Sequence, residues 1–172
     1  MGEIKSTLEL AMERTRNLVP TREEREEMAR REDQTQALAA VRRLLDGELT
    51  PAALSAQITR YEAKRPGFPW RTAVCREAAR ALVPGQNEGP VLEALRALGF
   101  PAAGALEEAV RRNMDRAAER AREADKRVRG VLASHGIRGS AVVPSLEADP
   151  AWQEAQARLR SEFAADRDRL LA

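Results

Sequence analysis

The residues of this chain that could act as a nucleophile, a base or a metal ligand are few. It has one cysteine, Cys75, and one histidine, His135, too few for a common zinc site, which takes several Cys or His ligands. The sequence also lacks a GxxxxGK[ST] loop, a GxGxxG loop, an HExxH pair and a CxxC pair. We therefore expect neither a bound metal nor a cofactor.

Cys75 and His135 could in principle form a nucleophile–base pair, because an adjacent imidazole activates a thiol. Simpler roles explain both residues. Cys75 falls on the apolar side of a predicted helix, beside Val74 and Ala78, where a free cysteine behaves as a small hydrophobic residue. His135 follows a long predicted helix, whose C-terminal dipole favours a cation. We predict no catalytic residue and a chain that is not an enzyme.

A basic segment, residues 64–80, is the candidate site for nucleic-acid binding. Its sequence, KRPGFPWRTAVCREAAR, contains a single acidic residue, Glu77. Two short helices joined by a tight turn would imitate a helix-turn-helix. The prolines of the turn and the near-neutral net charge of +2 argue for the alternative, a solvated helix face. The candidate contacts to nucleic acid are Arg65, Arg71, Arg76 and Arg80.

Composition indicates that helices position all of these residues. Aromatic residues make up 3% and charged residues 33% of the 172 residues, so the core must be built from aliphatic side chains and alanine, the strongest helix former. We predict an all-α fold that forms one cooperative unit. Its parts are an N-terminal helical arm with a second helix (1–48), a short-helix subdomain (49–100) and a long antiparallel helical hairpin (101–172).

The N-terminal arm carries a narrow apolar stripe. Residues 3–18 are predicted to be helical, with apolar or small side chains at alternating spacings of three and four, as in coiled coils. The next helix begins at a capping box, Thr21 and Glu24, but its first half, residues 22–36, is too polar to bury itself. We therefore expect the stripe to contact another protein, a second copy in a homodimer, or the chain's own hairpin. The candidate self-association face is Ile4, Leu8, Ala11 and Leu18, with Met1 and Thr15 on the same stripe.

The subdomain should contain three short helices. The first starts at Thr50 and Pro51, a good N-terminal signal. The third ends at Gly99, a typical C-terminal residue. The residues predicted to face the core are Leu54, Ile58, Tyr61, Val74, Cys75, Ala78, Leu82, Val91, Leu92, Leu95 and Leu98.

The hairpin should consist of a long helix over residues 102–134 and a final helix that begins at Asp149 and Pro150. Alanines in the middle of the long helix favour a close antiparallel partner. Acids are interleaved with bases over residues 111–129, which favours a solvated helix face over the alternative, an RNA-binding surface. The inward residues are predicted to be Leu106, Val110, Met114, Ala117, Ala121, Ala124, Val128 and Val131, with Trp152, Ala155, Leu159, Phe163 and Leu170.

The connection between the two hairpin helices, residues 135–149, is longer than a helical turn requires. It contains Val142, Val143 and Leu146, and burying such side chains is worth roughly 1.5–3 kcal/mol each. We predict a packed connection that lies as an extended cap on the hairpin end or on the subdomain. The alternative is a loop that binds a partner or ligand.

Two stretches, MGEIKSTLELAMERT at the N-terminus and GIRGSAVVPSLEADPAW near the C-terminus, are similar to a family of small, uncharacterised bacterial proteins. The resemblance is confined to these two ends. It implies a helical bacterial protein without an assigned activity, and it transfers no functional residue to this chain.

Cellular location is indicated by what the sequence lacks. A single cysteine fits a reducing compartment, acidic residues near the N-terminus do not fit a signal peptide, and no apolar run is long enough to span a membrane. We expect a cytoplasmic protein without a membrane partner. The leading interpretation is a non-enzymatic protein–protein interaction or scaffolding module, and the alternative is a nucleic-acid-binding regulator that uses residues 64–80.

Overall fold

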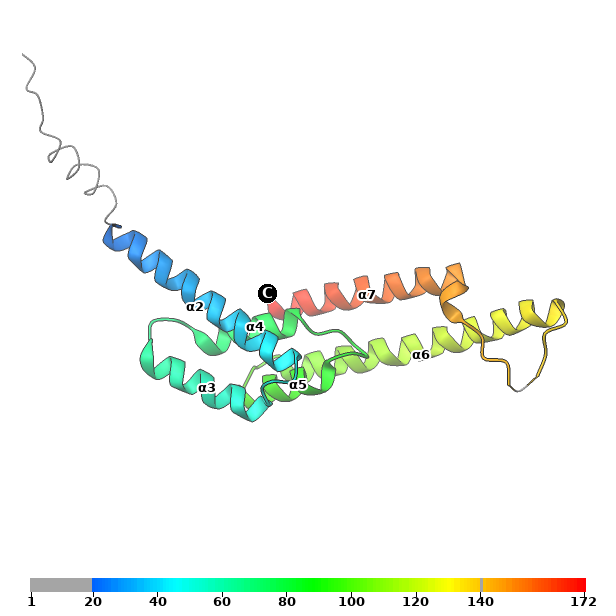
Figure 1. Cartoon of the computed structure of the whole chain (residues 1–172), viewed down its shortest axis with the longest axis horizontal. Coiled ribbons are helices and arrows are strands. Elements are labelled where there is room, and N and C mark those ends of the chain that lie inside the picture. Colours follow the sequence, from blue (N-terminus) through cyan, green and yellow to red (C-terminus); the bar gives the residue numbers. More distant parts are fainter. Residues whose placement is uncertain (1–19, 140) are drawn as a thin grey trace, which may run out of the picture.

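The computed structural model describes residues 20–139 and 141–172, and its regular structure in these ranges is entirely helical (Figure 1). This confirms the predicted all-α class. The elements are α2 (Arg22–Leu45), α3 (Pro51–Lys64), α4 (Trp70–Arg80), α5 (Glu88–Ala97), α6 (Ala103–Ser134), the short 3-10 helix η1 (Leu146–Ala148) and α7 (Pro150–Leu171).

Local signals in the sequence set the ends of these helices. In the capping box of α2, the Thr21 hydroxyl accepts from the Glu24 backbone N–H at 3.2 Å, and the Glu24 carboxylate accepts from the Thr21 N–H at 2.6 Å. Thr50 and Asp149 cap α3 and α7 through their side chains, each followed by a proline. Gly99, after α5, adopts a φ of 70°, which glycine tolerates without the strain other residues would incur. The predicted boundaries of the helices from residue 22 onward therefore hold closely.

The main core lies where the second half of α2 meets α3, α4, α5 and the first turns of α6. Trp70 is its largest fully buried side chain, and the rings of Tyr61 and Phe68 pack against it with centroid distances of 4.7 and 4.8 Å. Phe163 of α7 joins the same cluster. This core takes residues from all three predicted parts of the chain, so the short helices do not form a core of their own.

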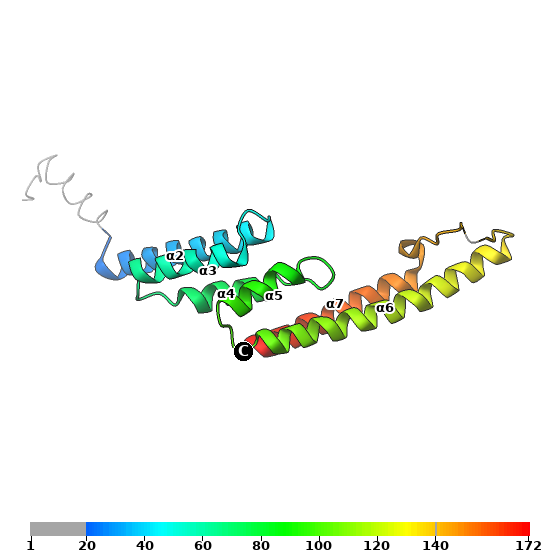
Figure 2. The ribbon, with the colours of Figure 1, turned by 90° about the horizontal axis from the view of Figure 1, so that it is seen from below.

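The helices α6 and α7 lie side by side and antiparallel, and together they extend away from the core (Figures 1 and 2). The Asn113 amide donates to the Leu159 carbonyl at 2.9 Å, and Arg127 pairs with Asp149 at 2.8 Å. Because α6 has 32 residues and α7 has 22, the last turns of α6 continue past the start of α7. The hairpin predicted from the sequence is thus present, with arms of unequal length.

Two of the predicted inward positions on α6 are wrong. Met114 is 41% exposed and Val131 is 59% exposed. Beside Met114, it is the Asn113 side chain that contacts α7, through its hydrogen bond to the Leu159 carbonyl. Val131 lies beyond Arg127, which already contacts the N-cap residue of α7, so no α7 turn is left to cover it.

Candidate interaction surfaces

The predicted self-association face, Ile4, Leu8, Ala11 and Leu18, lies outside the described residues. The structure does describe the helix that follows it. From Arg22 to Glu32 no side chain is buried, and this half of α2 projects from the bundle (Figure 1). It is a continuous helix, so the half predicted to be too polar to bury itself projects into solvent as regular helix.

An ion pair with a buried carboxylate attaches this projecting helix to the core. Asp33, only 4% exposed, accepts a hydrogen bond from Arg65 Nη1 at 2.5 Å. The backbone carbonyl of Arg65 in turn accepts from the indole N–H of Trp70 at 3.3 Å. Sequence reasoning missed Asp33 because the surrounding half-helix is polar. The available signal was its position four residues before the buried Ala37, on the same face as Leu44.

The four arginines proposed to bind nucleic acid do not form one free basic surface. Arg65 is held by Asp33, Arg71 donates to both Glu62 carboxylate oxygens at 3.0 and 3.1 Å, and Arg80 pairs with Glu77 at 2.7 Å. The fourth, Arg76, is exposed and makes no ion pair within the described part of the chain. Three of the four charges are thus partly neutralised by carboxylates.

Cys75 and His135 are not arranged as a catalytic pair. Cys75 is 1% exposed in the core, and burial raises the pKa of its thiol to about 11, an effect that the charge of Arg71 only partly offsets. The thiol is therefore protonated at neutral pH, and a protonated thiol is a poor nucleophile. His135 is exposed at the C-terminal end of α6, in the hairpin tip.

The described residues contain no cluster of three or more His, Cys, Asp or Glu side chains that could hold a metal ion. Within the same ranges, no helix combines the length and apolar character needed to cross a membrane.

The connection between α6 and α7 is packed only on one side. Val142 and Leu146 are half-buried, whereas Val143 is 88% exposed, so the prediction of a packed residue is wrong at that position. Exposure alternates along residues 141–146, so that successive side chains point to opposite sides. The segment lies on the hairpin end, where Arg129 Nη1 donates to the Val142 carbonyl at 3.2 Å, and it does not reach the short helices (Figure 2).

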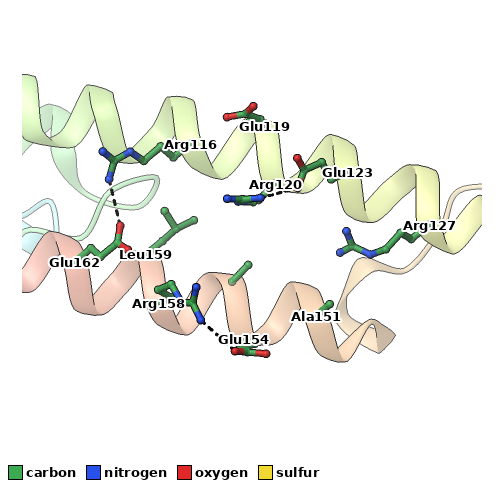
Figure 3. A pocket seen from close by; sticks show the side chains of 11 residues that line it. Arg116, Glu119, Arg120, Glu123, Arg127, Ala151, Glu154, Arg158, Leu159 and Glu162 are labelled. Atoms are coloured by element: carbon green, nitrogen blue, oxygen red, sulfur yellow. Dashed lines mark hydrogen bonds and ion pairs between the residues drawn. The ribbon is translucent and has the colours of Figure 1, made fainter.

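A charged groove runs between α6 and α7 on the projecting part of the hairpin (Figure 3). Its volume is about 540 Å³, and four arginines and four glutamates line it. Three ion pairs join six of these side chains: Arg116 with Glu162 at 3.2 Å, Arg120 with Glu123 at 2.9 Å and Arg158 with Glu154 at 3.3 Å. The two alanines of the groove, Ala151 and Ala155, and Leu159 line it between these charges. The groove is electrically balanced, which does not favour a strongly acidic or strongly basic ligand.

A second cavity, of about 420 Å³, lies where the α4–α5 loop meets the hairpin. Trp152 and Phe163 contribute apolar surface to it, and Arg167 lines its edge while donating to the Arg80 carbonyl at 2.8 Å. The guanidinium is thus used to attach α7 to the end of α4. Sequence reasoning did not anticipate either cavity, because both depend on how α7 is placed against distant elements.

Comparison with protein-family models, curated proteins and solved structures finds no significant match to this chain. The resemblance of its two terminal stretches to a family of small bacterial proteins therefore stays a prediction.

Proposed function

We propose that this chain is a non-enzymatic helical module for protein–protein interaction or scaffolding, acting in the cytoplasm. The observation that carries the proposal is the length of helix that extends beyond the core with few buried side chains. No side chain is buried from Arg22 to Glu32, and among the described residues between 111 and 158 only Ala124 and Trp152 are buried. Helical arms of this kind present long surfaces to partner proteins.

The projecting half of α2 suits a stalk for the apolar stripe of residues 1–18. Its capping box stabilises the N-terminal end of the helix, and the Asp33–Arg65 pair attaches the helix to the core. The stripe has the three-and-four spacing of coiled-coil helices. The partner at the stripe is another helical protein or a second copy of this chain, and a membrane is not among the proposed partners.

Nucleic-acid binding through residues 64–80 remains the alternative function, with less support. Ion pairs with carboxylates hold three of its four candidate arginines, and pairing of this kind lowers the positive potential that attracts phosphate.

Leu8→Glu in the full-length chain tests the proposal, with Ser6→Glu as the control that adds the same charge off the stripe. Sedimentation velocity reports self-association, and cross-linking in the native host reports other partners. We expect Ser6→Glu to keep every association of the wild type and Leu8→Glu to lose only the partner bound at the stripe, seen as a missing cross-link or a smaller oligomer. Identical association of all three chains would contradict a role for the stripe.

A further inference from the structure

The geometry points to a second copy of this chain, antiparallel to the first, as the partner of the charged groove face in Figure 3. This inference rests on the proposed function only in requiring a protein partner. It assigns the contact to α6 and α7, and it does not involve residues 1–19.

The charges on the α6 side of the groove are complementary to themselves. Arg116, Glu119, Arg120 and Glu123 line it in the order plus, minus, plus, minus, with spacings of three, one and three residues. The spacing is unchanged when the helix is reversed, but every sign is inverted. In an antiparallel pair of α6 helices, Arg116 therefore meets Glu123 of the second copy, and Glu119 meets Arg120.

Two of the three charges on the α7 side of the groove have the same property about the same point. Glu154 and Arg158 carry opposite charges, so reversal again sets each against its opposite. The third, Glu162, pairs with Arg116 in its own chain and falls level with Pro150 of the second copy. Asn113 contacts Leu159 and Arg127 contacts Asp149, which places the middle of the α6 pattern level with the α7 turn containing Glu154 and Arg158. One two-fold axis can thus align both helices, as an isologous dimer requires.

The shape of the hairpin is also suited to this partner. Two antiparallel hairpins packed face to face make a four-helix bundle, the usual way for such helices to cover their open faces. The floor residues Ala151 and Ala155 are small, and the aliphatic stems of the arginines add apolar area.

The complementary charges are expected to set the orientation of the pair more than its strength. Most groove carboxylates already have an intramolecular partner, so dimerisation mainly exchanges one ion pair for another. Further along α6, Arg127 would meet Arg112 of the second copy, but Asp149 and Glu108 pair with these two residues within each chain. We therefore expect a weak dimer that high salt dissociates.

Two charge reversals in the full chain test the inference. In the Glu119→Arg dimer, the new arginine of each copy faces Arg120 of the other copy. In the Arg120→Glu dimer, the new glutamate of each copy faces Glu119 of the other copy. Each variant alone should weaken dimerisation by about ten-fold or more, the equivalent of about 1.4 kcal/mol. An equimolar mixture of the two should form a heterodimer in which all of these pairs are again opposite. Arg122→Glu, an exposed α6 position outside the groove, is the control.

Sedimentation velocity at low salt over a wide concentration range measures the association, and circular dichroism verifies that each variant is helical. Loss of dimer in both variants with recovery in the mixture supports the inference. A monomeric wild type, equal weakening by Arg122→Glu, or failure of the mixture to recover would overturn it. A dimer that Leu8→Glu abolishes and Glu119→Arg leaves intact overturns this inference but supports the stripe.

Discussion

Asp33 on α2 and Arg65 after α3 are joined by a 2.5 Å hydrogen bond, with the carboxylate side chain 6% exposed and the guanidinium 42% exposed. The two residues are far apart in the sequence, and their contact fixes the point at which α2 leaves the core. The carboxylate is buried and the guanidinium reaches solvent. Removal of Arg65 would therefore leave a buried charge unpaired, whereas removal of Asp33 would leave a charge that water can solvate.

Arg65→Ala should lower the free energy of unfolding by about 2 kcal/mol, because it leaves the buried Asp33 carboxylate without its counter-charge. Arg71→Ala is the matched control, since its partner Glu62 has a side chain that is 33% exposed, and such pairs contribute at most about 1 kcal/mol. Urea denaturation of both variants gives the comparison. Equal losses would show that the Asp33 pair has no special role.

Burial of Cys75 predicts a dependence of stability on alkaline pH. The folded-state pKa is raised from 9.0 to about 11, so the folded chain keeps the thiol proton after the unfolded chain has lost it. The stability contributed by the neutral buried thiol is complete below pH 9 and is lost as the pH rises to about 11.

The amount lost should be on the order of 3 kcal/mol, from two pKa units at about 1.4 kcal/mol each. Cys75→Ala has no group that titrates here, so its stability should fall less over the same interval. Subtracting the two pH profiles removes the contribution of the other titrating groups. If the wild type and Cys75→Ala lost stability equally over this pH interval, the thiol would have to be accessible to solvent in the folded chain.

The sequence predicted what short-range rules determine, namely the helix class, the capped ends at Thr21, Thr50 and Asp149, and the buried faces of the short helices. Prediction from the sequence failed where the burial of a residue depends on which distant helix packs against it. Asp33 lies in a polar stretch, and only its alignment with Arg65 makes its burial tolerable. Likewise the balanced groove exists because α7 sets Glu154, Arg158 and Glu162 beside the charges of α6, a register that helical spacing alone does not provide.

The nucleic-acid alternative makes its own prediction about retention on heparin. Because carboxylates hold Arg65, Arg71 and Arg80, we expect the full chain to pass through a heparin column even at low salt. A triple variant, Arg71→Ala, Arg76→Ala and Arg80→Ala, should elute at the same position. Retention of the wild type that falls steeply with salt and disappears in the triple variant would instead favour the regulator function.

The free energy of unfolding should depend strongly on the buried residues of α7 and little on the exposed apolar residue of the connection. Phe163 is 5% exposed and joins the main core, whereas Val143 is 88% exposed. Phe163→Leu should lower the free energy of unfolding by roughly 1–2 kcal/mol, through lost contacts and incomplete filling of the space. Val143→Ser should change it by less than about 0.5 kcal/mol. A large loss of stability in Val143→Ser would mean that Val143 is packed in solution, as the apolar sequence of the connection predicts.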